Sequence, residues 1–264
     1  MSNYAVSGAA CSNSITPRIE PQTQIPYPSV LEYEVPAFLA ENRLHKRPSE
    51  STVYTIWIGT NDLGYEGFLT DSQARNATVA TYVDCVYHAL DTVYAEGGRH
   101  FVLMNLAPLH LAPLYAVPEH GGTTAEESQY WTSKPENITE VSHRMKDQVV
   151  MINQVFAYRT PYELLIARRY PGARFAVMDM YGLVCSHFTV GARMVTPQTN
   201  QSHSYPIYTT IPRTIQGSRT SPLLTASVTM KPGSVSVFQT QRNICGLMNC
   251  TRQSRQTELL QSSL

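Results

Sequence analysis

The sequence has few charged residues, no net charge and no long apolar segment. Charged side chains make up 15% of its 264 residues, and 20 basic residues balance 20 acidic ones. There is no basic stripe, so we expect neither nucleic acid nor an anionic membrane as a partner. No apolar run approaches the roughly 20 residues that a membrane-spanning helix requires. With 42% hydrophobic residues, the composition indicates an ordered globular protein of one domain rather than a disordered chain.

Cysteine pairs with the spacing of a metal or redox motif are also missing. The five cysteines are Cys11, Cys85, Cys185, Cys245 and Cys250. None forms a CxxC pair and no histidine lies near one at zinc-ligand spacing, so we expect no metal site. The residues Met1–Val6 lack a basic segment followed by an apolar core, so no signal peptide is predicted there. Glycosylation sequons at Asn76 and Asn137 are compatible with secretion, although such matches are frequent by chance.

Three short apolar segments and two periodic segments predict a parallel sheet with covering helices. The predicted strands are Val53–Ile58, Phe101–Leu106 and Phe175–Met180, and Tyr4–Val6 is a possible stub of a fourth. Apolar residues recur at helical spacing from Val79 to Val93 and from Ile138 to Phe156. Alternating strands and helices are typical of an α/β fold. The segment Leu111–Pro135 predicts a long loop at the carboxyl edge of the sheet, where ligands bind in such folds.

From residue 184 onward the pattern changes. No helical or alternating periodicity holds beyond a few positions, and Ser, Thr, Gln and Arg dominate. We therefore expect an irregular C-terminal tail at residues 184–264.

Two short motifs carry candidate chemistry. Ile58–Gly64 (IGTNDLG) directly follows a predicted strand, where the Asn61 amide can be aimed at a developing oxyanion. The flanking glycines allow a substrate to approach closely, so Gly59 and Asp62 are candidate substrate-binding residues. In the other motif, Asn3–Asn13, Gly8 can present a backbone N–H to the same oxyanion. The alternative is that Gly-x-Asn-Asp forms a turn that caps the next helix.

Together the motifs resemble the SGNH/GDSL hydrolases, and more narrowly the fungal acetylesterases of carbohydrate esterase family sixteen. The resemblance rests on Asn3–Arg18, Trp57–Gly64, Met104–Leu109 followed by Pro113, and Val177–Leu183. It implies a partial SGNH domain over residues 1–183, with a three-layer α/β/α, flavodoxin-like parallel sheet, and oxyanion donors at Gly8 and Asn61. It also implies a secreted, monomeric serine esterase that removes acetyl groups from carbohydrate esters without a cofactor.

The same resemblance implies that none of the Ser–His–Asp triad is retained. The family's nucleophile lies in a Gly-Asp-Ser block on a first strand, upstream of the segment that matches Asn3–Arg18. Ser7 falls beside the oxyanion glycine and is a poor substitute. Asp179 matches a structural position at a strand end rather than the triad aspartate. Without its first strand, an interior one in the order 2-1-3-4-5, the sheet is expected to have two unpaired edges inside it.

The family's closing Asp–His block is likewise absent from the visible frame. Leu247–Thr257 can encode such a block in another reading frame, and Val184–Cys185 can be read as a splice donor. We therefore interpret residues 184–264 as a retained intron followed by out-of-frame translation. The chain as printed is expected to be inactive. Two alternatives stay open, a non-catalytic binder of acetylated saccharides and a gene-model fragment without a function.

No histidine supports a rival enzyme. His88 and His143 lie in predicted helices and His110 and His120 in the predicted loop. A surface or core position is a better interpretation of each than a catalytic base.

Overall fold

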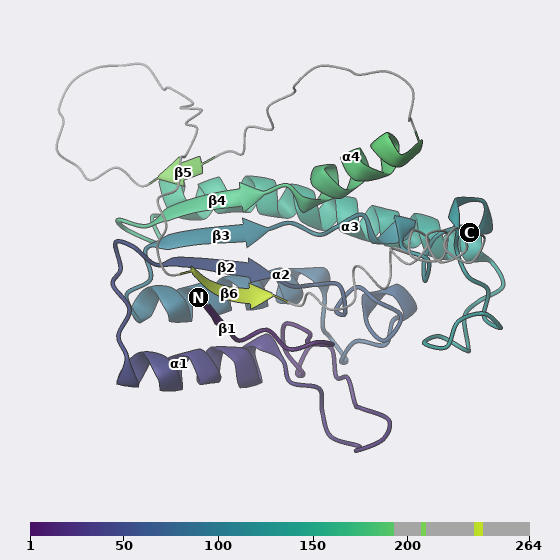
Figure 1. The fold of residues 1–264 in the computed structure, drawn as a ribbon, viewed down its shortest axis with the longest axis horizontal. Helices are drawn as coiled ribbons and strands as arrows, with labels where there is room; N and C mark the ends of the chain where they lie inside the picture. Colours follow the sequence, from purple (N-terminus) through teal and green to yellow (C-terminus); the bar gives the residue numbers. More distant parts are fainter. Residues whose placement is uncertain (193–206, 210–234, 240–264) are drawn as a thin grey trace, which may run out of the picture.

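The computed structural model describes residues 1–192, 207–209 and 235–239, with side chains through residue 186. Within these residues, six strands form one sheet in the order β1-β6-β2-β3-β4-β5 (Figure 1). The strands are β1 (Ser2–Asn3), β2 (Val53–Trp57), β3 (His100–Met104), β4 (Arg174–Met178), β5 (Ile207–Thr209) and β6 (Val235–Gln239). The neighbouring strands from β1 to β4 run parallel, and β5 pairs antiparallel with β4. The α/β architecture predicted from the sequence is therefore confirmed.

Three helices lie in the connections between successive parallel strands, from β1 to β2, β2 to β3 and β3 to β4, and a fourth follows β4. They are α1 (Val35–Leu44), α2 (Val79–Ala95), α3 (Ile138–Pro161) and α4 (Met180–Ala192). π-helical turns adjoin two of them, η1 (Val30–Glu34) before α1 and η5 (Tyr162–Ile166) after α3. Three short 3-10 turns are η2 (Phe68–Thr70), η3 (Leu109–Leu111) and η4 (Pro118–His120). Of these, η3 lies at the start of the predicted loop that leads to α3, and η4 lies within its first half.

Local signals fix where the two predicted helices begin. Thr78 forms a capping box with Thr81 at the start of α2, and the Asn137 side chain accepts from the Glu140 N–H at the start of α3. The sequence did not predict α1, whose buried face consists of Val35, Phe38 and Asn42. The polar Asn42 interrupts the apolar pattern at this face, so the helical period is hidden.

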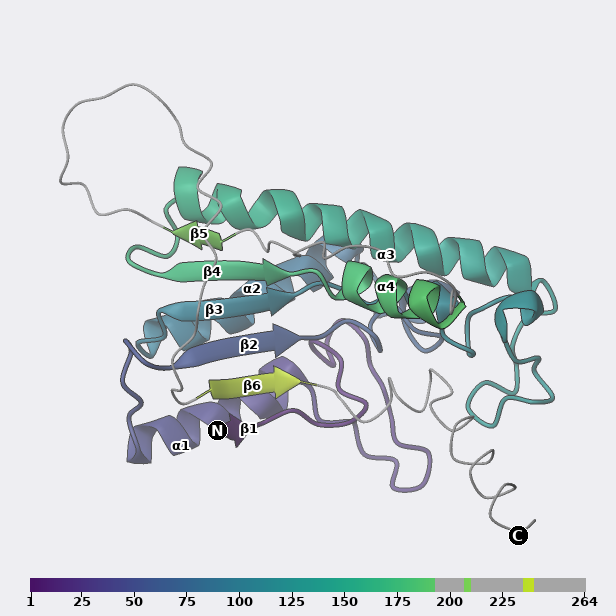
Figure 2. The ribbon, with the colours of Figure 1, turned by 45° about the horizontal axis from the view of Figure 1, so that its top comes forward.

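The two faces of the sheet are covered to different extents. Figures 1 and 2 together show α1, α2 and α3 on one face, and α4 toward the other face at the carboxyl ends of the strands. Side chains that alternate along the strands follow this division: Tyr54, Phe101 and Phe175 are buried, whereas Val102 and Ala176 are half-buried. The rings of Phe101 and Phe175 stack with centroids 4.6 Å apart. The main core therefore lies between the sheet and the layer of α1 to α3.

The prediction of two unpaired edges inside the sheet is wrong. β6 lies between β1 and β2 and pairs in parallel with both, with Val237 aligned to Asn3 on one side and to Thr55 on the other. The interior place expected to be empty is thus filled by a strand from the C-terminal part of the chain. A five-residue strand is too short to give a lasting periodicity, so the sequence did not reveal it.

The prediction of a wholly irregular tail also needs correction. α4 continues without interruption past residue 183, and β5 and β6 are regular strands at residues 207–209 and 235–239. The rest of the predicted tail lies outside the described residues. In the part of the chain that the structure describes, no helix combines the length and apolar character needed to cross a membrane.

Candidate functional site

The two predicted oxyanion donors come from different loops that touch each other. Asn61 lies four residues beyond the carboxyl end of β2, and Gly8 lies in the loop that follows β1. The Asn61 Nδ2 donates a hydrogen bond to the carbonyl oxygen of Ala9 at 2.8 Å. An amide NH₂ group has two hydrogens, so this bond leaves the second hydrogen for another acceptor. The structure therefore places the Asn61 amide against the segment that carries Gly8.

Gly8 has a backbone conformation that favours glycine. Its φ is +86°, in the left-handed region, and an added Cβ would lie 3.0 Å from the Tyr27 ring. The Arg18 guanidinium donates to the Gly8 carbonyl oxygen and forms an ion pair with Glu66 at 2.7 Å. The same guanidinium lies over the Tyr27 ring, 4.8 Å from its centroid. The Gly8 peptide is thus held by contacts on more than one side.

Gly59 is required for close packing against α2. Its φ is +122°, and an added Cβ would lie 2.2 Å from the Tyr82 hydroxyl oxygen. That hydroxyl donates to the Ile58 carbonyl oxygen at 2.9 Å, which ties the end of β2 to the helix. Burial raises the pKa of Tyr82 well above its usual value, so the hydroxyl stays protonated as a donor. A substrate contact at Gly59 stays a prediction, whereas the packing against Tyr82 is observed.

Asp62 is fully buried and its carboxylate is hydrogen-bonded within the protein. Its two oxygens accept from the Cys11 N–H at 3.0 and 3.1 Å, and one of them also accepts from the Thr16 hydroxyl at 3.3 Å. Burial raises the pKa of Asp62 to about 6, although the bonds from Cys11 and Thr16 oppose that rise. The carboxylate thus connects the Asn61 loop to the segment that follows Gly8, and substrate binding by Asp62 stays a prediction.

A disulfide that the sequence did not predict joins this segment to α2. Cys11 and Cys85 are bonded, with their Cα atoms 6.2 Å apart and 74 positions apart in sequence. Both cysteines are buried. No short spacing motif predicts this disulfide, because only the fold brings the two cysteines together. The disulfide is typical of proteins that fold in an oxidising compartment.

Asp179 has a structural position at the end of β4, as predicted. Its carboxylate accepts from the Gly182 N–H at 3.0 Å and from the Asn105 Nδ2 at 2.9 Å. Asn105 in turn accepts from the Tyr181 N–H at 3.0 Å. These bonds satisfy donors at the start of α4 and join the carboxyl ends of β3 and β4. The network explains Asp179 without a catalytic role.

A cleft of about 590 Å³ adjoins the Gly8 segment. Its walls come from three loops and include Arg18, Tyr65, Glu66 and Trp131. The rings of Tyr65 and Trp131 stack with centroids 5.4 Å apart. Because Arg18 also donates to Gly8, this cleft lies next to the candidate oxyanion site. The aromatic rings and the paired charges give it the mixed character of a small-molecule site.

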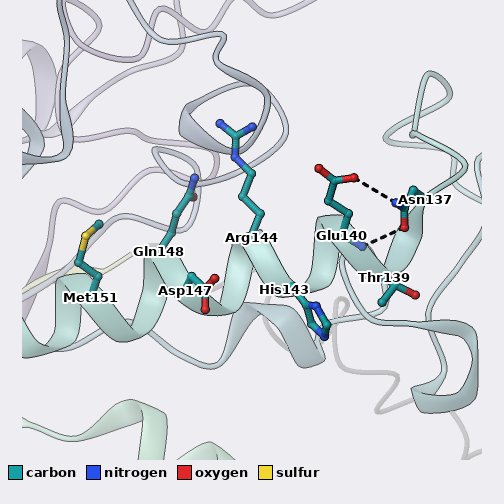
Figure 3. A pocket seen from close by; sticks show the side chains of 8 residues that line it. All are labelled: Asn137, Thr139, Glu140, His143, Arg144, Asp147, Gln148 and Met151. Carbon is teal, nitrogen blue, oxygen red and sulfur yellow. Dashed lines mark hydrogen bonds between the residues drawn. The ribbon is translucent and has the colours of Figure 1, made fainter.

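Another cleft, of about 690 Å³, runs along the outer side of α3 and is not lined by Gly8 or Asn61. Figure 3 shows its lining residues: Asn137, Thr139, Glu140, His143, Arg144, Asp147, Gln148 and Met151. Arg144 and Gln148 leave the helix on the same side and both donate to the Phe68 carbonyl oxygen. These bonds fasten η2 to α3. The wide opening and the internal bonds make this cleft a poorer candidate for chemistry than the one beside Gly8.

A complete catalytic triad is not found among residues 1–186. In this part of the chain no serine hydroxyl is hydrogen-bonded to a histidine ring, and no group of three potential metal ligands occurs. His88, His120 and His143 are exposed, in agreement with their interpretation as surface residues. His110 is half-buried and stacks on Tyr181 with ring centroids 6.0 Å apart, and burial lowers its pKa.

Comparison with known proteins shows a similarity to a curated enzyme. No protein-family model matches the chain. Over 202 residues, however, it is 36% identical to a curated acetylesterase from Hypocrea jecorina. The chain is similar to an acetylesterase. The aligned part is 75% of this chain but only 58% of the relative, so the chain spans less than two thirds of that acetylesterase.

Proposed function

We propose that this chain carries the oxyanion-binding part of a serine acetylesterase of the SGNH type, and that residues 1–264 alone do not complete the triad. The observation that carries the proposal is the contact between Asn61 and the Gly8 segment at the carboxyl end of β2. The 36% identity to an acetylesterase supports the same chemistry. In such an enzyme a serine attacks the acetyl carbonyl, and backbone and amide N–H groups stabilise the oxyanion that forms.

In this proposal Gly8 and Asn61 have different tasks. One hydrogen of the Asn61 amide holds the Ala9 carbonyl, and the other is directed to the oxyanion in the proposed reaction. The backbone N–H of Gly8 is the companion donor. Two donors at fixed separation are favourable because they need not reorganise while the charge develops.

The proposed substrate is an acetyl ester of a carbohydrate. The cleft beside Gly8 offers aromatic surface from Tyr65 and a charged pair, Arg18 and Glu66, that can bond sugar hydroxyl groups. The name of the relative supports acetyl ester hydrolysis but says nothing of the sugar. A secreted monomer with a three-layer SGNH fold is part of this proposal, and the buried Cys11–Cys85 disulfide favours an oxidising compartment.

The first test measures hydrolysis of a small chromogenic acetyl ester by the purified 264-residue chain. We expect a rate no higher than that of buffer, because the oxyanion donors lack a nucleophile and its base. Binding of an acetylated oligosaccharide without hydrolysis is the outcome that favours a non-catalytic binder. Hydrolysis that is sensitive to a serine-directed inhibitor and is lost in Asn61→Ala would overturn the incomplete triad while retaining the oxyanion role.

The second test uses the gene. We propose that residues 184–264 are a retained intron followed by out-of-frame translation, so the genomic DNA must contain particular codons. The Leu247 codon must end in G and the Cys250 codon in C, and Val184–Cys185 must open with a splice donor. An upstream frame should supply a signal segment and a Gly-Asp-Ser block. In an enzyme made from the restored frame, Asn61→Ala should lower kcat about 100- to 1,000-fold with little change in KM. A Leu247 codon that ends in another base contradicts the interpretation of the tail.

A further inference from the structure

The Gly8 segment and the Asn61 loop are joined at two adjacent points. Asn61 donates to the Ala9 carbonyl oxygen at 2.8 Å, and the next residue, Asp62, accepts from the Cys11 N–H. Consecutive residues of one loop therefore bind alternate residues of the other. Such a pair of contacts fixes both the separation and the relative rotation of the two loops, which a single hydrogen bond cannot do.

Helix α2 is bonded to both loops. Tyr82 and Cys85 are three positions apart on this helix, so they lie on the same face. Tyr82 bonds to the Ile58 carbonyl just before Gly59, and Cys85 is bonded to Cys11. The helix thus holds the beginning of one loop and the middle of the other.

We propose that Asp62 is the positioning residue of this site: its buried carboxylate holds the Gly8 segment against the Asn61 loop, so that both oxyanion donors keep one fixed separation. The functional role of Asp62 rests on the proposed function, but its effect on the position of the two loops can be measured without a substrate. Asp62 bonds to Cys11 and Thr16, so it spans a stretch that begins three residues after Gly8. It makes no contact with substrate in this role.

The electrostatic surroundings of Asp62 give the proposal a second readout. Burial is the largest influence on Asp62 and raises its pKa to about 6, whereas the hydrogen bonds from Cys11 and Thr16 and the charge of Arg18 lower it. The charge of Asp62 in turn raises the pKa of the Tyr82 hydroxyl. An ionised carboxylate is a stronger acceptor than a neutral carboxyl group. We therefore expect protection of the Cys11 amide to increase about fivefold as the pH rises through about 6, after correction for intrinsic exchange.

The test is site-resolved hydrogen exchange on the full chain. Asp62→Ala should raise exchange about tenfold at Gly8, Cys11 and Thr16 while leaving β3 protected. Asp62→Asn keeps one oxygen acceptor, so it should restore most of the protection but lose its dependence on pH. Asp147→Ala, at an exposed residue of α3, is the matched control.

Two further outcomes decide whether Asp62 has this positioning role. If Asp62→Ala does not fold, Thr16→Val removes only one of the bonds and should raise exchange locally at Thr16 and Cys11. Exchange that equals the Asp147→Ala control, or that rises equally throughout β3 and β4, would overturn the positioning role. Because no substrate is involved, failure of this test is distinguishable from failure of the proposed esterase function.

Discussion

The buried carboxyl group of Glu34 makes a sharp prediction about stability and pH. Glu34 is the last residue of η1, it is 1% exposed, and its Oε1 accepts from the Val6 N–H at 2.9 Å. Burial raises its pKa from 4.5 to about 7, and the bond from Val6 only partly opposes that rise. The folded protein therefore prefers the protonated form of this group.

The sign of the effect follows from the raised pKa. Stability due to Glu34 is fully present below about pH 4.5 and is lost as the pH rises through about 7. Each pKa unit corresponds to about 1.4 kcal/mol, so the loss amounts to about 3 kcal/mol. Glu34→Gln keeps an oxygen for the Val6 N–H but cannot ionise. Relative to wild type, this variant should gain about 3 kcal/mol between about pH 4 and about pH 8.

Urea unfolding at several pH values measures this gain directly. Asp62 titrates in both proteins, so its contribution cancels in the comparison of Glu34→Gln with wild type. Glu126→Gln, at an exposed position, is the matched control and should keep the wild-type pH profile. Parallel profiles for wild type and Glu34→Gln would refute the assignment of a neutral, buried carboxyl group.

Three further predictions follow from the described contacts. Val237→Pro removes a backbone N–H donor from the interior strand β6 and should lower the free energy of unfolding by about 3 kcal/mol or more. Urea unfolding measures this loss, and an unchanged midpoint would show that β6 does not pair between β1 and β2. Replacing Cys11 and Cys85 together by serine should lower the unfolding free energy by about 2–5 kcal/mol. Alkylation of unfolded wild type without reductant should modify Cys185 but leave Cys11 and Cys85 unmodified, which peptide mass analysis would show. Gly59→Ala should lower the thermal midpoint, and Tyr82→Phe in the same chain should recover only part of the loss, because the contact of the added Cβ with Leu106 and the strain of the positive φ remain. Full recovery would show that overlap with the Tyr82 hydroxyl alone is responsible.

Part of the site could be predicted because its signals are local. The motif around Asn61 follows an apolar strand segment, and both signals lie within a few residues of each other. The sequence therefore placed Asn61 at a strand's carboxyl end, and the structure confirms that place. What the sequence could not supply was the partner of each side chain. The burial of Asp62, its bond to Cys11 and the contact of Gly59 with Tyr82 join residues that are far apart in the chain.

The sequence by itself determined the elements whose period repeats over enough residues. The strands β2, β3 and β4 and the helices α2 and α3 were predicted within a few residues of their observed bounds, because alternation, helical spacing and capping act between near neighbours. Only the tertiary structure decided the interior place of β6, the Cys11–Cys85 bond and the burial of Glu34. Each of these depends on a contact across many residues, whose formation is governed by the packing of the whole sheet against its helices rather than by local pattern.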